Sequence, residues 1–241
     1  MSDADKIFCA LDTPSLQVAL DWSERLKGTV GGLKLGLEFF GAQGPDGIRR
    51  VAAGGMPIFL DLKFHDIPNT VAQAVASVTP LAPLLLTIHA GGGRTMMKAA
   101  VDAAAEAAAR AGVARPKILA VTVLTSMDQG DLADIGIDDS AEAQVVRLAR
   151  LAQDAGVDGV VCSPREIAPI RAACGRDLIL TVPGIRPAGA ALGDQKRVMT
   201  PRDAVDAGAT YLVIGRPITE AADPVDAARS IAETLAPATA G

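Results

Sequence analysis

Short apolar runs and longer helical stretches alternate along the whole chain. The clearest helical stretches are 94–112 and 141–156, where apolar residues recur at helical spacing and a glycine stands at the end. Glycine best tolerates the left-handed conformation that follows a helix C-terminus. The apolar runs have the length of strands and lie at 6–11, 32–36, 57–63, 84–90, 117–124, 158–163, 178–184 and 211–215. Strands that alternate with helices in this way are typical of a parallel sheet with helical crossovers.

The number of strand-helix units favours one α/β architecture. Eight units in a chain of 241 residues predict a closed (β/α)₈ TIM barrel rather than an open sheet. No linker or shift of composition divides the chain, so we predict a single domain over residues 1–241, with a frayed tail at 236–241. Barrels of this class build their active sites at the carboxyl ends of the strands. The residues at the strand ends are therefore the candidates for function.

Ionisable residues stand at the ends of the first three predicted strands. Asp12 follows the first strand, Lys34 lies in the second, and Asp61 and Lys63 end the third. Side chains alternate between the two faces of a strand, so Asp61 and Lys63 project to one side and the leucines beside them to the other. At a barrel mouth these residues would form a cluster of compensated charge. Ordinary ion pairs are the alternative, but buried charge is costly, and four such groups favour a functional site.

A different chemistry is predicted after the last two strands. The seventh strand runs into VPGIRP, with Gly184 and Arg186, and the eighth into VIGRPIT, with Gly215 and Arg216. In barrels these two loops frequently bind phosphate, because glycine lets the backbone approach the anion and arginine can clamp it. Gln195 lies between the two motifs and is a possible neutral donor. Tight turns beside solvated arginines are the alternative, but two such pairs at the expected strand ends favour a phosphate site.

Several other polar residues allow two interpretations. Asp66 stands just before a predicted helix with Pro68 in its first turn, so Asp66 can be a helix cap as easily as a functional group. Thr70 can be an ordinary helix residue. Thr125 and Ser126 follow the fifth strand, where they can bind a ligand or form a turn. The residues alone leave these alternatives open.

Composition excludes several classes of function. The formal net charge is −5 and the pI about 5.1, so the chain has no basic signature for nucleic acid. No apolar run approaches the ~18 residues of a membrane span, so we expect no membrane partner. The cysteines are three in number and form no CxxC pair, and the two histidines have no partners at metal-ligand spacing. With no signal-peptide pattern at the N-terminus, we predict a cytoplasmic protein without a metal site.

A resemblance to a known family rests on the motifs at the strand ends. The stretch DLKFHDIPNT at 61–70 resembles the signature of the orotidine 5′-phosphate decarboxylase family. Weaker motifs extend the resemblance over nearly the whole chain, namely ALDTP, KLG, AVTVLTSM, VPGIRP and VIGRPIT. The resemblance implies a lyase that decarboxylates orotidine 5′-monophosphate to UMP and CO₂ in de novo pyrimidine biosynthesis. It also implies that the reaction needs no metal and no other cofactor.

The resemblance further implies a role for each matching residue. Lys63 would protonate the C6 carbanion, and Asp61 would lie beside the substrate carboxylate. Asp12 and Lys34 would contact the ribose and complete the charged network. The rest of the nucleotide would be bound by Thr125 or Ser126 at the pyrimidine and by Gln195, Gly215, Arg216 and Arg186 at the phosphate. In this family Asp66 and Thr70 reach into the neighbouring subunit's site, so the resemblance implies a homodimer.

Two rival functions have to be distinguished from this one. Mg²⁺-dependent sugar-phosphate decarboxylases and hexulose-phosphate synthases share the barrel and the Asp-x-Lys-x-x-Asp pattern. They carry a glutamate metal ligand where this chain has Lys34, and a protonated lysine cannot bind Mg²⁺. A non-catalytic nucleotide-phosphate-binding barrel is the rival from another class. That reading leaves the proton donor Lys63 without a purpose.

Overall fold

The computed structural model describes residues 2–187 and 199–236 and forms a closed barrel of eight parallel strands. Neighbours in the barrel follow chain order, and β8 closes onto β1. The strands are β1 Ile7–Leu11, β2 Gly32–Leu35, β3 Ile58–Phe64, β4 Leu85–His89, β5 Lys117–Val121, β6 Gly159–Val161, β7 Ile179–Val182 and β8 Tyr211–Ile214. The predicted (β/α)₈ barrel is confirmed.

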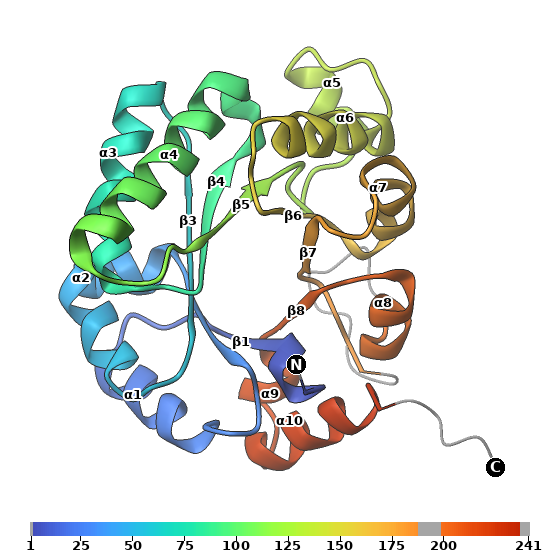
Figure 1. Ribbon diagram of the computed structural model, residues 1–241. Helices are drawn as coiled ribbons and strands as arrows, with labels where there is room; N and C mark the ends of the chain where they lie inside the picture. The colour runs from blue at the N-terminus through green and yellow to red at the C-terminus, as the bar shows by residue number, and fades with distance from the viewer. Residues whose placement is uncertain (1, 188–198, 237–241) are drawn as a thin grey trace.

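Helices surround the barrel on the outside (Figure 1). They are α1 Leu16–Arg25, α2 Leu37–Ala52, α3 Pro68–Val78, α4 Gly93–Ala111, α5 Gln129–Asp134, α6 Ala141–Asp154, α7 Ile167–Cys174, α8 Pro201–Ala207, α9 Arg216–Thr219 and α10 Pro224–Glu233, with short 3-10 turns at Ala4–Lys6, Thr79–Leu81, Ala90–Gly92 and Pro164–Glu166. The glycine stops predicted for α4 and α6 are confirmed, because Gly112 and Gly156 have φ of 65° and 80°. The helix α2 is kinked at Gly44, which Pro45 follows.

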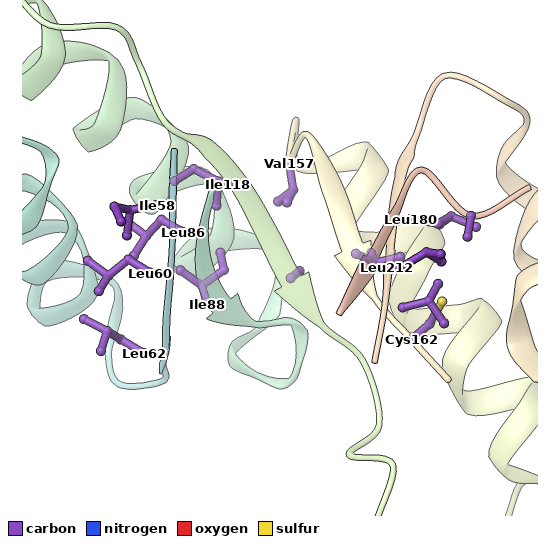
Figure 2. Close-up of a cluster of buried hydrophobic side chains, with 14 of the residues drawn as sticks. Ile58, Leu60, Leu62, Leu86, Ile88, Ile118, Val157, Cys162, Leu180 and Leu212 are labelled. Atoms are coloured by element: carbon purple, nitrogen blue, oxygen red, sulfur yellow. The ribbon is translucent and has the colours of Figure 1, made fainter. Parts of the chain in front are cut away.

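Two hydrophobic clusters divide the core. The larger one fills the space between strands and helices, and Figure 2 shows part of it, including Leu60 and Leu62 of β3 and Ile88 of β4. The smaller one lies inside the barrel and contains Phe8, Ala10, Phe59, Leu85, Leu119 and Val213. Phe8 contacts Phe59 edge to face at 6.0 Å between ring centroids. Above this layer the interior positions of β2, β3 and β4 become polar, which places charged side chains at one end of the barrel.

The strands that the sequence predicts all form, but several are shorter than predicted. The fifth was predicted over 117–124 and ends at Val121, and the sixth was predicted over 158–163 and spans Gly159–Val161. The difference lies mainly at the carboxyl ends, where the chain leaves the ladder to form the loops of the barrel mouth. The predicted frayed tail falls almost wholly on 237–241, which are outside the described residues. Within the described ranges, no helix is both long and apolar enough to cross a membrane.

Candidate active site

The end of β3 departs from regular strand geometry. Its register with β4 runs from the pair Leu60 and Leu86 to the pair Phe64 and Ile88, so residues 61–63 on β3 lie opposite a single residue of β4. Such a bulge bends the strand and re-aims its side chains, and bulges are frequent beside active sites. Lys63 in this bulge has φ of 51°, a left-handed conformation that is uncommon for residues other than glycine.

Four charged residues from three strands meet at the mouth. The Lys63 ammonium lies 2.7 Å from Oδ2 of Asp61. Lys34 lies 3.7 Å from the same oxygen and 3.4 Å from Oδ1 of Asp12. The predicted cluster therefore exists as an alternating chain, Lys63–Asp61–Lys34–Asp12. Asp61 and Lys63 meet as predicted. Strand alternation is not the whole reason, because the bulge and the left-handed backbone of Lys63 also bring its ammonium to Asp61.

Burial and charge act against each other at Asp61. Its side chain is almost completely buried, which alone would raise the pKa of the carboxyl group. Lys34, Lys63 and a hydrogen bond from Thr87 outweigh the burial, so the pKa lies below its ordinary value. Asp61 is therefore ionised at neutral pH and holds two ammonium groups. Asp12, at the other end of the chain of charges, is exposed to solvent.

A cavity of about 210 Å³ opens beside this cluster. Its charged lining comes from β2 and β3, and most of its apolar lining comes from β5 to β8 and the loops that follow them. The lining residues are Lys34, Phe59, Asp61, Lys63, Val121, Val123, Leu124, Thr125, Val161, Cys162, Pro183 and Val213. Burial raises the pKa of the Cys162 thiol, so this thiol is uncharged and lines the cavity without acting as a nucleophile. The cavity suits a flat, partly apolar ring with a charged edge.

Two arginines lie close together on the β7 and β8 side of the mouth. Arg186 is 8% exposed, and its Nη1 donates to the carbonyl of Ile185 at 3.0 Å. Burial and the like charge of Arg216 lower the pKa of Arg186. Glu220 opposes this effect. Two neighbouring guanidinium groups suit an anion such as a phosphate group. Arg216 and Asp12 also line a second cavity, of about 510 Å³.

The two glycines of this region have different reasons to be glycine. Gly184 has φ of 78°, so the turn conformation alone requires it. Gly215 has a negative φ of −106°, and a Cβ there would make only ordinary contact with Ala10, at 3.4 Å. Crowding by neighbouring atoms therefore does not explain the glycine at 215. Gln195, the third predicted phosphate residue, lies outside the described residues.

Asp66 and Thr70 do not join the cluster of their own chain. Both are exposed, and neither lines the 210 Å³ cavity. The capping interpretation of Asp66 is wrong: α3 begins at Pro68, its N-cap is Ile67, and no side chain caps it. Asp66 Oδ1 instead accepts a hydrogen bond from the Ile67 N–H at 2.6 Å. The predicted place of Pro68 in the first turn is confirmed.

The two candidates after β5 differ in position. Thr125 lines the 210 Å³ cavity, and Ser126 is exposed and does not line it. The cavity therefore favours Thr125 as the residue that contacts a bound ring. Both stay predictions as ligand contacts.

The sequence reasoning missed three polar residues near the cluster. Thr87 contacts both Asp61 and Lys63. His65 and His89 stack with ring centroids 5.2 Å apart, and burial, then His65 and Lys63, lower the pKa of His89. Strand parity could have identified Thr87 and His89, because both share the face of the inward-pointing Leu85. Among the described residues, no group of three or more His, Cys, Asp or Glu side chains could hold a metal ion.

These features define a class: a (β/α)₈ barrel with a lysine-aspartate network beside a ring-sized cavity and an arginine pair at the last two strands. The model of the orotidine 5′-phosphate decarboxylase / HUMPS family matches residues 5–231. The chain therefore belongs to this family.

Individual relatives agree with the family match. The chain is 56% identical over 227 residues to an orotidine 5′-phosphate decarboxylase of Rhodospirillum rubrum, covering 94% of this chain and 92% of that protein. It is 54% identical over 229 residues to the decarboxylase of Paramagnetospirillum magneticum, covering 95% and 97%. Among solved structures, the decarboxylase of Lactobacillus acidophilus superimposes with a TM-score of 0.82 at 36% identity, covering 95% of this chain and 98% of that one.

Proposed function

We propose that this chain decarboxylates orotidine 5′-monophosphate to UMP and CO₂, the last step of UMP synthesis. The observation that carries the proposal is the alternating chain Lys63–Asp61–Lys34–Asp12 at the mouth of the barrel. Relatives that are named as this decarboxylase match the chain almost from end to end. The cavity beside the cluster combines a charged edge with apolar walls, which fits a pyrimidine ring.

Lys63 has the central chemical role in this proposal. The bond between C6 and the carboxylate carbon breaks, and its electron pair stays on C6 as a carbanion in the plane of the ring. A preorganised ammonium stabilises this charge and then transfers its proton to C6. The neutral amine regains a proton from solvent. The contact of 2.7 Å with Asp61 supports this role, because the adjacent carboxylate holds the ammonium in place before the reaction.

The other residues of the site bind and orient the nucleotide. Asp61 lies beside the departing carboxylate, and Asp12 and Lys34 contact the ribose hydroxyls. Gly215, Arg216 and Arg186 bind the phosphate, together with Gln195, and Thr125 contacts the pyrimidine. Binding energy from the phosphate, far from the reacting carbon, can hold the site closed around the ring. The like charges of Arg186 and Arg216 support this assignment.

We further propose that the active unit is a homodimer in which Asp66 and Thr70 complete the partner's site. Both residues are exposed, and neither belongs to the Lys63–Asp61–Lys34–Asp12 network of its own chain. Ile67 beside them is 67% exposed, so this surface also offers a partner subunit an apolar side chain to cover. A reducing, cytoplasmic location is proposed as well, supported by three buried free cysteines.

The Mg²⁺-dependent rivals on this barrel are disfavoured by the position of Lys34. Its ammonium lies 3.7 Å from Asp61 and 3.4 Å from Asp12, so a fixed cation stands where those enzymes need an oxygen ligand. The direct test is the conversion of orotidine 5′-monophosphate by purified protein in EDTA, followed by UV absorbance and product chromatography. We expect UMP at the same rate with and without EDTA. A strict requirement for Mg²⁺, or no turnover, would contradict the proposal.

The shared site is tested by mixing two inactive variants, Lys63→Ala and Asp66→Ala. A mixed dimer regains one intact site, so up to about a quarter of the wild-type activity should return after subunit exchange. The matched control mixes Lys63→Ala with Lys34→Ala, whose residues belong to the same site, and should recover nothing. Recovery in both mixtures, or in neither, would contradict a site composed of two subunits.

A further inference from the structure

One buried hydroxyl connects the two central charged residues of the site. Oγ1 of Thr87 on β4 donates to Oδ1 of Asp61 at 2.9 Å and accepts from the backbone N–H of Lys63 at 2.9 Å. The Thr87 side chain has no exposed surface. A hydroxyl offers one donor and can accept as well, so this bridge uses both functions of the group.

The bulge in β3 explains why a side chain is needed at this point. Residues 61–63 lie opposite Thr87 alone, so three residues of β3 share one position of β4. The Lys63 N–H bonds to the hydroxyl of Thr87 instead of a carbonyl of the β4 ladder. This bond helps to hold Lys63 in its left-handed conformation, at φ of 51°, from which its ammonium reaches Asp61.

The same hydroxyl fixes the orientation of the Asp61 carboxylate. Oδ2 of Asp61 faces both lysines, with Lys63 at 2.7 Å and Lys34 at 3.7 Å. Oδ1 faces Thr87. With a partner on each oxygen, the carboxylate cannot rotate without breaking a hydrogen bond. Since Thr87 is neutral, it fixes this geometry without changing the net charge of the cluster.

We propose that Thr87 is a positioning residue for the decarboxylation: it locks the Asp61 carboxylate and the Lys63 backbone in the geometry from which Lys63 delivers its proton. This inference rests on the proposed function for its catalytic consequence. The bridge itself rests only on the contacts between Thr87, Asp61 and Lys63.

The test compares Thr87→Val, which keeps the shape but lacks the hydroxyl, with Thr87→Ser, which keeps the hydroxyl. We expect Thr87→Val to lower kcat about 10- to 100-fold, the range for one hydrogen bond to a charged group, with KM nearly unchanged. The acid limb of its pH–rate profile should shift to higher pH, because the Asp61 carboxylate loses one donor. Thr87→Ser should restore both kcat and the profile to near wild type.

Thr181→Val is a matched control for the loss of a buried hydroxyl. Thr181 lies on β7, is fully buried, and its hydroxyl has no hydrogen-bond partner among the described residues. This variant should keep the wild-type kcat and pH profile. Wild-type values for Thr87→Val, or equal losses in the valine and serine variants, would overturn the positioning role.

Amide hydrogen exchange at Lys63 separates the bridge from the proposed function. The Lys63 amide should be protected in the wild type and in Thr87→Ser and should exchange much faster in Thr87→Val. If the wild type fails to turn over orotidine 5′-monophosphate, the proposed function fails, and Lys63 exchange still decides whether the bridge exists. Equal exchange of Lys63 in all three proteins would overturn the inference.

Discussion

The two sides of the barrel mouth organise their charges in opposite ways. On the β2 and β3 side, Lys63, Asp61 and Lys34 alternate in sign, and Asp61 is ionised because its two lysines outweigh its burial. On the β7 and β8 side, Arg186 and Arg216 carry the same sign, and burial together with the charge of Arg216 lowers the pKa of Arg186. The first side alternates the signs of its charges, and the second brings two like charges near each other.

From this difference we infer that the β2 and β3 side carries out the chemistry and that the β7 and β8 side binds the substrate. A network that is already compensated needs no reorganisation when the reaction begins, which is the condition for electrostatic stabilisation of a carbanion. A pair of repelling cations gains most when a dianionic phosphate arrives between them. Substitutions on the β3 side should therefore act on kcat, and substitutions on the β8 side should act on KM.

The largest expected effect follows from removing the ammonium at the end of β3. Lys63→Ala should lower kcat at least about 10⁴-fold, because it removes both the stabilising charge and the proton donor. Binding of UMP, measured by calorimetry, should change little. Lys98→Ala is the matched control, since Lys98 is exposed on α4 and pairs with Asp102 at 3.1 Å. Strong residual turnover in Lys63→Ala would remove the chemical role from the β3 side.

A smaller effect is expected on the other side of the mouth. Arg216→Ala should raise KM for orotidine 5′-monophosphate roughly 10- to 100-fold, the range of one charged hydrogen bond, and should change kcat less. Turnover of orotidine, which lacks the phosphate, should be nearly the same in both proteins. Arg94→Ala serves as control, because Arg94 is exposed and pairs with Asp154 at 3.2 Å. A loss that is equally large with orotidine would place Arg216 outside the phosphate site.

The smallest expected effect concerns the histidine beside the cluster. Burial, His65 and Lys63 lower the pKa of His89, and Asp61 opposes them. A histidine whose folded pKa is lowered stabilises the fold above its unfolded pKa of about 6.5, and this stability is lost as the pH falls. The melting temperature of wild type should therefore drop more between pH 7.5 and 5.5 than that of His89→Gln, by on the order of 1–2 °C after solvent screening. Identical drops would contradict this pKa shift.

The sequence predicts the architecture and much of the site. Alternating strands and helices are enough for the barrel, and the carboxyl ends of the strands identify Asp12, Lys34, Asp61 and Lys63. These residues could be found because the fold class dictates where they lie. The cluster depends on the order of the strands in the barrel, which is the same as their order along the chain.

Features that depend on exact register could not be predicted. The bulge opposite Thr87 and the left-handed backbone of Lys63 arise from how β3 pairs with β4. No residue type in 61–63 indicates either feature. Strand parity places Thr87 on the inward face of β4, but its bridge to Asp61 and Lys63 depends on this register. The capping role considered for Asp66 failed for a related reason, since the helix begins one residue later than that role requires, at Pro68.

We propose that this barrel decarboxylates orotidine 5′-monophosphate through a C6 carbanion that a lysine protonates. The most direct measurement is proton NMR of the product formed in D₂O with EDTA present, because the Lys63 ammonium exchanges with solvent. We expect UMP with deuterium at C6, formed together with an equal amount of CO₂. Unchanged substrate, or conversion only after Mg²⁺ is restored, would contradict it.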